Sequence, residues 1–163
     1  MKTLMTTTLA AALSIAAFSP AIAGEQSTIV VESESAMQAW QKDVGRSLDR
    51  RLATATKQTR IDPVSGIVQL RFTLDGSGKP RDISVLNGSG DTRTDFVAKR
   101  AVRGLTQLAN APVANASEQT FQANIVFADD KATYSKLAKA LAASENIRMA
   151  QADSEGGVIS FGL

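Results

Sequence analysis

Pairs of aspartates are the residues of this sequence best suited to chemistry, because one carboxyl group can donate a proton while its neighbour accepts one. Such pairs occur at Asp43/Asp49, Asp91/Asp95 and Asp129/Asp130. Each pair has a simpler role as a helix cap or a surface charge. Nothing in the sequence indicates that two of these carboxyl groups flank a cleft, so the pairs predict no acid–base centre.

Two further motifs resemble sites for nucleophilic catalysis or phosphate binding. A serine lies close to a lysine at Ser135/Lys136 and at Ser77/Lys79, but the first pair is expected on an exposed helix and the second at a hairpin tip. Neither place offers the buried lysine that such a base requires. A phosphate-binding loop needs Ser or Thr after its Gly-Lys, whereas Pro80 follows Lys79. We therefore predict a non-enzymatic protein with no catalytic residues and no cofactor.

The composition excludes further classes of site. The chain of 163 residues contains no cysteine and no histidine, which removes thiol nucleophiles, disulfides, histidine bases and histidine-containing metal sites. We expect no metal site. With 44% hydrophobic and 21% charged residues, the chain suits one globular domain. A net charge of +2 is too small to indicate nucleic acid as the partner.

The N-terminal segment has the pattern of a secretory leader. Lys2 precedes the apolar stretch Leu4–Ala17. The small residues Ala21 and Ala23 then form the small-x-small pattern that precedes a cleavage site. We predict a signal peptide over 1–23, with cleavage after Ala23 and a periplasmic product. The less favoured alternative is an uncleaved inner-membrane anchor that faces the periplasm, since the threonines at 6–8 and Pro20 weaken the stretch as a membrane span.

An extended arm is predicted over 24–34, followed by a helix. Ser35 and Gln38 form a capping box at the start of this helix, which is expected to end near residue 53. Its apolar side recurs every three or four residues, at Met37, Trp40, Val44, Leu48 and Leu52. A basic side carries Lys42, Arg46 and Arg50, candidates for contact with an anionic polymer; a solvated helix face is the simpler interpretation.

Three strands are predicted from alternating apolar residues. The first ends at Leu74, a hairpin loop over 75–80 leads to the second, and the third runs from Gln119 to Phe127. A helix beginning near Thr92 separates the second strand from the third, and a final helix is expected to follow Asp129/Asp130 and end near residue 143. The remaining 144–163 form a tail in which Val158–Phe161 could make one more strand.

The predicted fold class is therefore α+β: a three-stranded antiparallel sheet in the order α-β-β-α-β, with helices on one face and an additional C-terminal helix. The domain is expected to span 35–143. The outward side chains of the strands should then be wet or used for contacts. If the third strand lies at the sheet edge, its backbone could pair with an extended peptide, and Gln122 and Asn124 would add polar contacts. The alternative is that Thr28–Val31 or Val158–Phe161 covers this edge.

The segment Gly66 to Phe127 resembles the C-terminal domain of TonB, the energy-transducing protein of Gram-negative bacteria. The resemblance rests on a strand, a glycine-containing hairpin, a second strand, a turn, an alanine-rich helix and a last strand, at Gly66–Asp75, Gly78–Pro80, Ile83–Leu86, Asn87–Gly90, Ala98–Leu105 and Gln122–Phe127. It implies the TonB C-terminal-like version of the fold described above.

The resemblance also implies a class of partner. TonB domains bind a short extended segment of outer-membrane transporters as an added strand beside their last strand, which corresponds to Thr120–Phe127 here. We therefore expect Thr120, Gln122, Asn124 and Val126 to bind an extended peptide of an outer-membrane transporter or another envelope protein. Some members contact peptidoglycan, and full transducers couple to the ExbB-ExbD motor. The alternatives are thus a membrane-anchored energy transducer and a cell-wall-associated scaffold.

Overall fold

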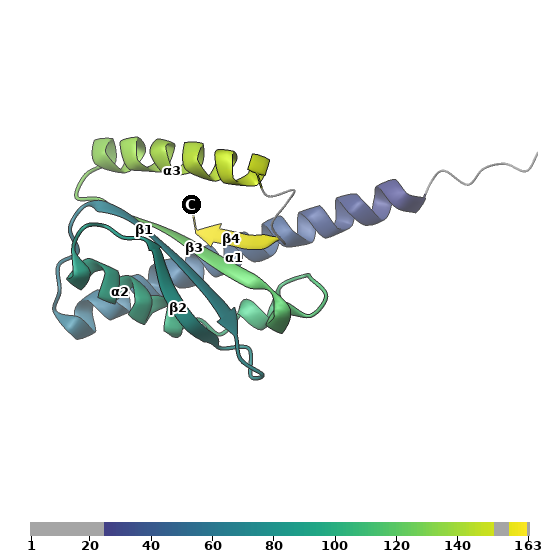
Figure 1. Ribbon diagram of the computed structural model, residues 1–163, viewed down its shortest axis with the longest axis horizontal. Helices are drawn as coiled ribbons and strands as arrows, with labels where there is room; N and C mark the ends of the chain where they lie inside the picture. Colours follow the sequence, from purple (N-terminus) through teal and green to yellow (C-terminus); the bar gives the residue numbers. More distant parts are fainter. Residues whose placement is uncertain (1–24, 152–156, 163) are drawn as a thin grey trace, which may run out of the picture.

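The computed structural model describes residues 25–151 and 157–162, with side chains from Glu34 onward; the predicted signal peptide over 1–23 lies outside these residues. Within the described part, three α-helices and a four-stranded mixed sheet form an α+β fold (Figure 1). The elements in chain order are α1 (Glu25–Thr59), β1 (Gly66–Leu74), β2 (Pro80–Asn87), α2 (Thr92–Arg103), β3 (Thr120–Phe127), α3 (Lys131–Gln151) and β4 (Val158–Gly162), with short 3₁₀ turns at Leu108–Asn110 and Ala116–Glu118.

Helix α1 extends beyond both of its expected ends. The segment expected as an extended arm over 24–34 is helical from Glu25, because lengthening an existing helix needs no new nucleus and β-branched residues disfavour it only slightly. At the other end, Ala55 is buried and continues the apolar side, and the Thr59 hydroxyl donates to the Ala55 carbonyl at 2.8 Å. The helix is followed by Arg60, whose φ of 55° is left-handed.

The hairpin between β1 and β2 forms at the predicted position, since β1 ends at Leu74 and β2 begins at Pro80. The Asp75 carboxylate accepts hydrogen bonds from the backbone N–H groups of Ser77 (2.8 Å) and Lys79 (2.9 Å). Hydrogen bonds from Lys79 and Ser77 hold the pKa of Asp75 below its ordinary value. Asp75 thus fixes the loop that sets the register of the two strands.

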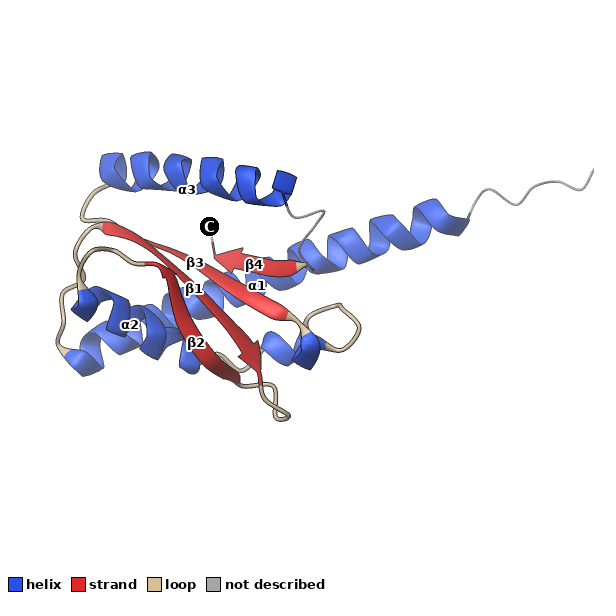
Figure 2. Ribbon diagram, viewed as in Figure 1, coloured by secondary structure: helices blue, strands red, loops and turns tan. Residues whose placement is uncertain are grey.

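The sheet has four strands rather than the three predicted, in the order β2-β1-β3-β4 (Figure 2). Strand β1 is antiparallel to both β2 and β3, whereas β4 runs parallel to β3. The parallel pairing is possible because α3 carries the chain back to the starting end of β3. The final strand considered at 158–161 therefore forms, and helix α3 occupies the first part of the predicted tail, up to Gln151.

Helices cover both faces of the sheet, which corrects the expectation that they lie on one face only. Helices α1 and α2 lie along one face, while α3 lies along the other (Figure 1). On the first face, apolar side chains of α1, α2 and the strands form a continuous core. On the second face, polar side chains of β1 and β3 meet Glu145 of α3. The outward residues Gln69, Gln122 and Asn124 are therefore buried under α3, whereas most residues of β2 stay exposed, as expected.

Four aromatic rings connect α1 to three of the strands. Trp40 of α1 lies 6.1 Å from Phe121 of β3 and 5.9 Å from Phe161 of β4, measured between ring centroids. Phe72 of β1 lies 5.8 Å from Phe121 and 6.2 Å from Phe161. Strand β4 is thus anchored in the apolar core through Phe161, which is 4% exposed.

Candidate functional site

Most of the predicted peptide-binding edge is occupied by the chain itself. Thr120, Gln122 and Asn124 of β3 lie opposite residues 158, 160 and 162 of β4, respectively. Over this stretch β3 pairs with β1 on one side and with β4 on the other, so it is not an edge strand. Val126 differs from the other three predicted residues because it lies beyond the last pair between β3 and β4.

The side chains of Gln122 and Asn124 do not face solvent. Gln122 is 0% exposed and Asn124 is 7% exposed. The Gln122 amide donates to Asn124 Oδ1 at 2.9 Å and to Glu145 Oε1 at 2.7 Å, and the Gln69 amide donates to the same two oxygens at 3.0 Å each. These residues form a buried polar network between the sheet and α3. Because their side chains are buried and already hydrogen-bonded, they are not free to contact a peptide as predicted.

Arg148 connects this network to β4. Its Nε donates to Glu145 Oε2 and its Nη2 to the Ser160 hydroxyl, both at 3.0 Å. Burial raises the pKa of Glu145, but hydrogen bonds from Arg148 and Gln122 outweigh the burial and the pKa lies below its ordinary value. Glu145 is therefore an ionised, partnered carboxylate with no proton to donate at neutral pH.

A cleft lies next to this network, between α1 and α3. Its volume is about 370 Å³, and β4 with the neighbouring part of β3 forms one side of it. It is lined by Gln41, Lys42, Asn124, Leu141, Ala142, Glu145, Asn146, Met149, Ser160, Phe161 and Gly162. Apolar and polar groups are mixed along the lining, as is usual for a site that holds a ligand by shape and orients it with a few hydrogen bonds.

A second hollow of about 280 Å³ adjoins the first, since both are lined by Gln41, Lys42, Asn124 and Gly162. It extends past the last residue pair of β4 to Val126 of β3 and Tyr134 of α3, whose side chain is 48% exposed. The predicted residue Val126 therefore lines the second hollow together with Gly162 of β4.

Strand β4 offers a backbone edge to the first hollow. It is a terminal strand of the sheet among the described residues, and Ser160, Phe161 and Gly162 line the cleft. The Gln41 side chain donates to the Ser160 carbonyl at 2.9 Å, which satisfies one backbone group beside the cleft with a side chain rather than with another strand. An end strand with a neighbouring hollow can accept an additional extended segment.

Glycine is required at position 162, which pairs with Asn124 in the last residue pair between β4 and β3. Its φ is 98°, which L side chains rarely adopt, and a Cβ atom there would lie 2.1 Å from the Asn124 carbonyl oxygen. Gly162 lines both hollows, so this close approach of the two backbones lies where the hollows adjoin. Only glycine fits this position without a change in the backbone.

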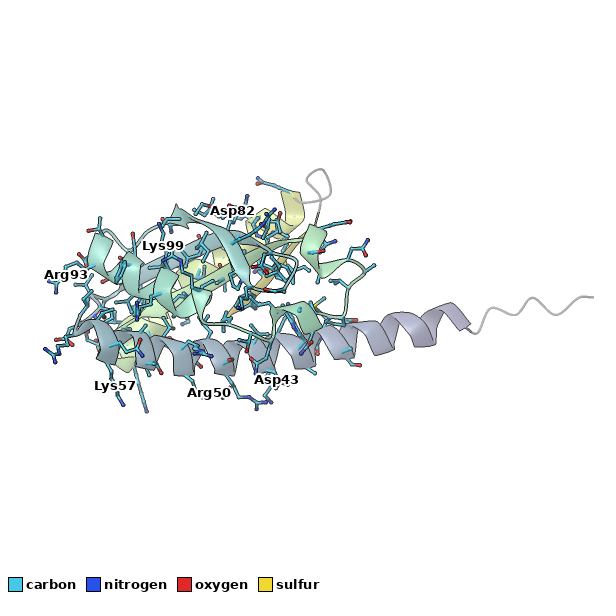
Figure 3. The ribbon with its side chains drawn as sticks, turned by 90° about the horizontal axis from the view of Figure 1, so that it is seen from below. Asp43, Arg50, Lys57, Asp82, Arg93 and Lys99 are labelled. Atoms are coloured by element: carbon cyan, nitrogen blue, oxygen red, sulfur yellow. The ribbon has the colours of Figure 1, made fainter. Side chains whose placement is uncertain are left out.

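The three residues of the predicted basic side, Lys42, Arg46 and Arg50, do not all line the same hollow. Lys42 lines both hollows and Arg46 lines the second, whereas Arg50 lines neither. Arg46 forms an exposed ion pair with Asp43. Figure 3 shows Asp43 and Arg50 on the outer side of α1, away from the sheet. Contact of these residues with an anionic polymer stays a prediction.

Two of the carboxylates that could suggest acid–base chemistry, Asp91 and Asp130, serve as helix caps. Asp91 accepts from the Thr94 N–H at 2.9 Å at the start of α2, and Asp130 accepts from the N–H groups of Ala132 and Thr133 at 2.7 and 3.0 Å at the start of α3. Among the described residues, no three Asp, Glu, His or Cys side chains are grouped to hold a metal ion. None of the described helices is long and apolar enough to cross a membrane.

Sequence reasoning missed the wall of the cleft that α3 provides. Glu145, Asn146 and Met149 fall in the segment predicted as a tail, because no apolar periodicity continues there. Of the α3 side chains, Leu141 alone is fully buried in the described structure. The usable signal was that 144–151 contains the helix-favouring residues Glu145, Arg148, Met149, Ala150 and Gln151 and neither Gly nor Pro.

The chain was compared with known proteins at three levels. No protein-family model, no curated protein and no solved structure matches it.

Proposed function

We propose that this chain is a periplasmic, non-enzymatic TonB-like binding module that pairs with an extended peptide segment of an envelope or outer-membrane transport protein. The observation that carries the proposal is the terminal strand β4 with its backbone beside the cleft between α1 and α3. In this proposal the peptide binds beside β4 and reaches Val126, instead of binding beside the covered part of β3.

The lining of the cleft suits an extended peptide. Added strands are held by backbone hydrogen bonds, and pockets for alternate side chains give them specificity. Leu141, Ala142 and Met149 would contact apolar side chains of the peptide, while Gln41 and Asn146 would contact polar ones. Met149 is 54% exposed, and its flexible side chain can adapt to different peptide side chains.

A matched pair of variants on α3 tests the proposal. Ala142 and Ala143 are both exposed and adjacent, but only Ala142 lines the cleft. We expect Ala142→Trp to fill the cleft and abolish peptide binding, and Ala143→Trp to leave it unchanged. The probes are synthetic peptides from the N-terminal segments of outer-membrane transporters, measured by calorimetry against the purified full chain.

Peptides with methylated backbone nitrogens provide the second arm of this experiment. They keep their side chains but cannot donate strand hydrogen bonds, so we expect them not to bind. Chemical-shift changes on binding should occur at Ser160, Phe161 and Gly162. Equal binding by both tryptophan variants, or equal binding of methylated and unmethylated peptides, would contradict the proposal.

A cell-wall-associated scaffold is the second candidate, carried by the exposed basic residues Lys42 and Arg46 at the rim of the cleft. Binding to purified peptidoglycan through these side chains should weaken steeply with salt. Binding that does not change with salt would contradict this role.

A further inference from the structure

A separate hollow lies between α1 and α2, and its lining shares no residue with the cleft beside β4. Its volume is about 310 Å³. It is lined by Arg51, Thr54, Ala55, Gln58, Phe96, Arg100, Arg103 and Gly104. Three of these eight side chains are arginines, supplied by two different helices, so the hollow concentrates positive charge.

The three arginines have no acidic partner. Within the described residues, no ion pair engages Arg51, Arg100 or Arg103. Arg100 Nη2 donates to the neutral Gln58 side chain at 3.0 Å, which links the two helices across the hollow. Unpaired guanidinium groups close to one another repel, and an anion bound between them relieves that repulsion.

Gly104 provides room for one of the three arginines. A Cβ atom at this position would lie 3.1 Å from Arg51 Cδ and 3.3 Å from Arg51 Nε. The Arg51 side chain therefore packs over the end of α2. Because Arg51 also lines the hollow, this contact restricts its side chain there and limits the side-chain entropy lost on binding.

The surrounding charge extends the positive field of the hollow. Residues 50–60 contain four basic and no acidic residues, and α2 contains four basic residues and one acidic residue. The acidic residue, Asp95, already accepts hydrogen bonds from the Ser89 N–H and hydroxyl at 2.9 and 2.8 Å. Figure 3 shows Lys57 and Arg93 at the same end of the molecule. The rest of the chain has ten basic and fifteen acidic residues, so the excess of basic over acidic residues is concentrated in these two segments.

An exposed aromatic ring lies among these charges. Phe96 of α2 lines the hollow, one helical turn before Arg100, and is 47% exposed. An exposed phenylalanine gains nothing from contact with water, but beside arginines it can enter the boundary between lipid headgroups and acyl chains. A purely polar polyanion would leave the ring without an apolar partner.

We propose that this hollow binds the phosphate group of an anionic phospholipid at a bilayer surface. Arg51, Arg100 and Arg103 would contact the phosphate oxygens, for which the guanidinium fork is well suited. Phe96 enters the interface beside the headgroup, and Lys57 and Arg93 add long-range attraction to the anionic surface. The cleft beside β4 contributes none of these residues and stays available for its own ligand.

Co-sedimentation of the full chain with lipid vesicles tests this proposal. We expect binding to vesicles of phosphatidylcholine mixed with phosphatidylglycerol, no binding to phosphatidylcholine alone, and a steep loss at high salt. The variant Arg51→Gln/Arg100→Gln/Arg103→Gln should bind on the order of 100-fold more weakly, since each basic residue near an anionic surface contributes roughly a factor of five. Phe96→Ser should weaken binding about tenfold while the charge is unchanged.

The control removes the same charge from a different surface. Lys131, Lys136 and Lys139 of α3 are exposed and lie outside the hollow. We expect Lys131→Gln/Lys136→Gln/Lys139→Gln to keep most of the binding. Equal losses in both triple variants would mean that net charge alone attracts the protein, and would overturn the proposed site.

Two other outcomes would also overturn it. One is that free inorganic phosphate binds to the hollow with the same dependence on the arginines while vesicles do not bind. The other is that a single-stranded DNA oligonucleotide binds more tightly than the anionic vesicles. If the triple arginine variant fails to fold, as checked by circular dichroism, Phe96→Ser decides the matter, because unchanged vesicle binding by this single variant contradicts the proposal.

Discussion

The two faces of the sheet are built on opposite principles. The face beneath α1 and α2 presents fully buried apolar side chains such as Leu70, Phe72 and Phe121. The face beneath α3 presents Gln69 and Gln122, which hydrogen-bond to a glutamate of the helix that covers them. One layer is held by the area of apolar surface removed from water, and the other by a small number of directional hydrogen bonds.

This difference accounts for the open space beside α3. Apolar layers are stable only when they are closely packed, so the first face leaves little room between sheet and helices. A polar layer is stable when its groups are paired, and the pairing of Glu145 and Arg148 with strand residues leaves the cleft beside β4 open. Five expected results, from the largest to the smallest, test this contrast.

Truncation on the apolar face should have the largest effect. Phe121 is fully buried and contacts two other aromatic rings. Phe121→Ala is expected to lower the free energy of unfolding by about 3–5 kcal/mol, from lost burial and the cavity that remains. Urea denaturation measures this change, and a loss under about 1 kcal/mol would contradict the assignment of this face as the core.

Substitution of Gly162 should have the next largest effect. Gly162→Ala forces a strained φ and a clash with the Asn124 carbonyl, and should cost about 2–3 kcal/mol or detach the end of β4. Amide hydrogen exchange of β3 then shows which response occurs. A Cβ atom on Gly76 of the hairpin would have nothing within 4 Å, so Gly76→Ala is the matched control and should change stability little.

Neutralisation of Glu145 should have a smaller effect than either of these. In Glu145→Gln the new amide NH₂ faces either the two glutamine amides or the Arg148 guanidinium, which are all donors. The expected loss is about 1–2 kcal/mol in the free energy of unfolding. If the loss equals that of Phe121→Ala, the polar face is as stabilising as the apolar one and the contrast fails.

The cost of Glu145→Gln should decrease at acidic pH. The pKa of folded Glu145 lies below the ordinary 4.5, so its carboxylate stabilises the fold above pH 4.5, and this contribution is lost as the pH falls through the lower, folded pKa. Comparing the two proteins at neutral and acidic pH removes the effect of other carboxylates, which both contain. A cost that is the same at both pH values would show that Glu145 acts by packing alone.

A polar substitution on the outer side of α3 should have the smallest effect. Ile147 is 60% exposed and lines neither hollow of the cleft. Ile147→Ser should change the free energy of unfolding by no more than about 0.5 kcal/mol. A much larger loss in thermal or urea denaturation would mean that this side of α3 is buried against a second molecule.

The elements that repeat a simple pattern were predictable from the sequence. Strands β1 and β3 alternate over nine and eight residues, whereas β2 alternates only at Ile83 and Val85 and is identified by the turn Asp75–Pro80 before it and the cap at Asp91 after it. Strand β4 was harder to predict because five residues do not identify their partner, and the parallel pairing with β3 depends on the whole of α3. The length of α1 was underestimated because its last turns are polar.

The site was harder to predict than the fold. Gln69, Gln122 and Asn124 alternate with apolar residues in the same way as solvent-exposed side chains do, so the sequence pattern does not distinguish a wet face from a buried polar network. Glu145 and Arg148 lie in the second half of α3, where the apolar spacing of Leu137, Ala138 and Leu141 does not continue, so the sequence does not indicate that this half also covers the sheet. Of the four predicted strand residues, Asn124 and Val126 border the cleft, and only Val126 does so beyond the end of β4.

The position of β4 after α3 also determines when the sheet is completed. Ribosomes make the N-terminal elements first, and β3 precedes its outer partner by the whole of α3. Until 158–162 have been made, the backbone groups of Thr120–Asn124 form an open edge of the kind that joins strands of neighbouring chains. The chain is therefore most prone to aggregate in the interval after β3 has been made and before β4 docks, and a chaperone that shields this edge would be needed only during that interval.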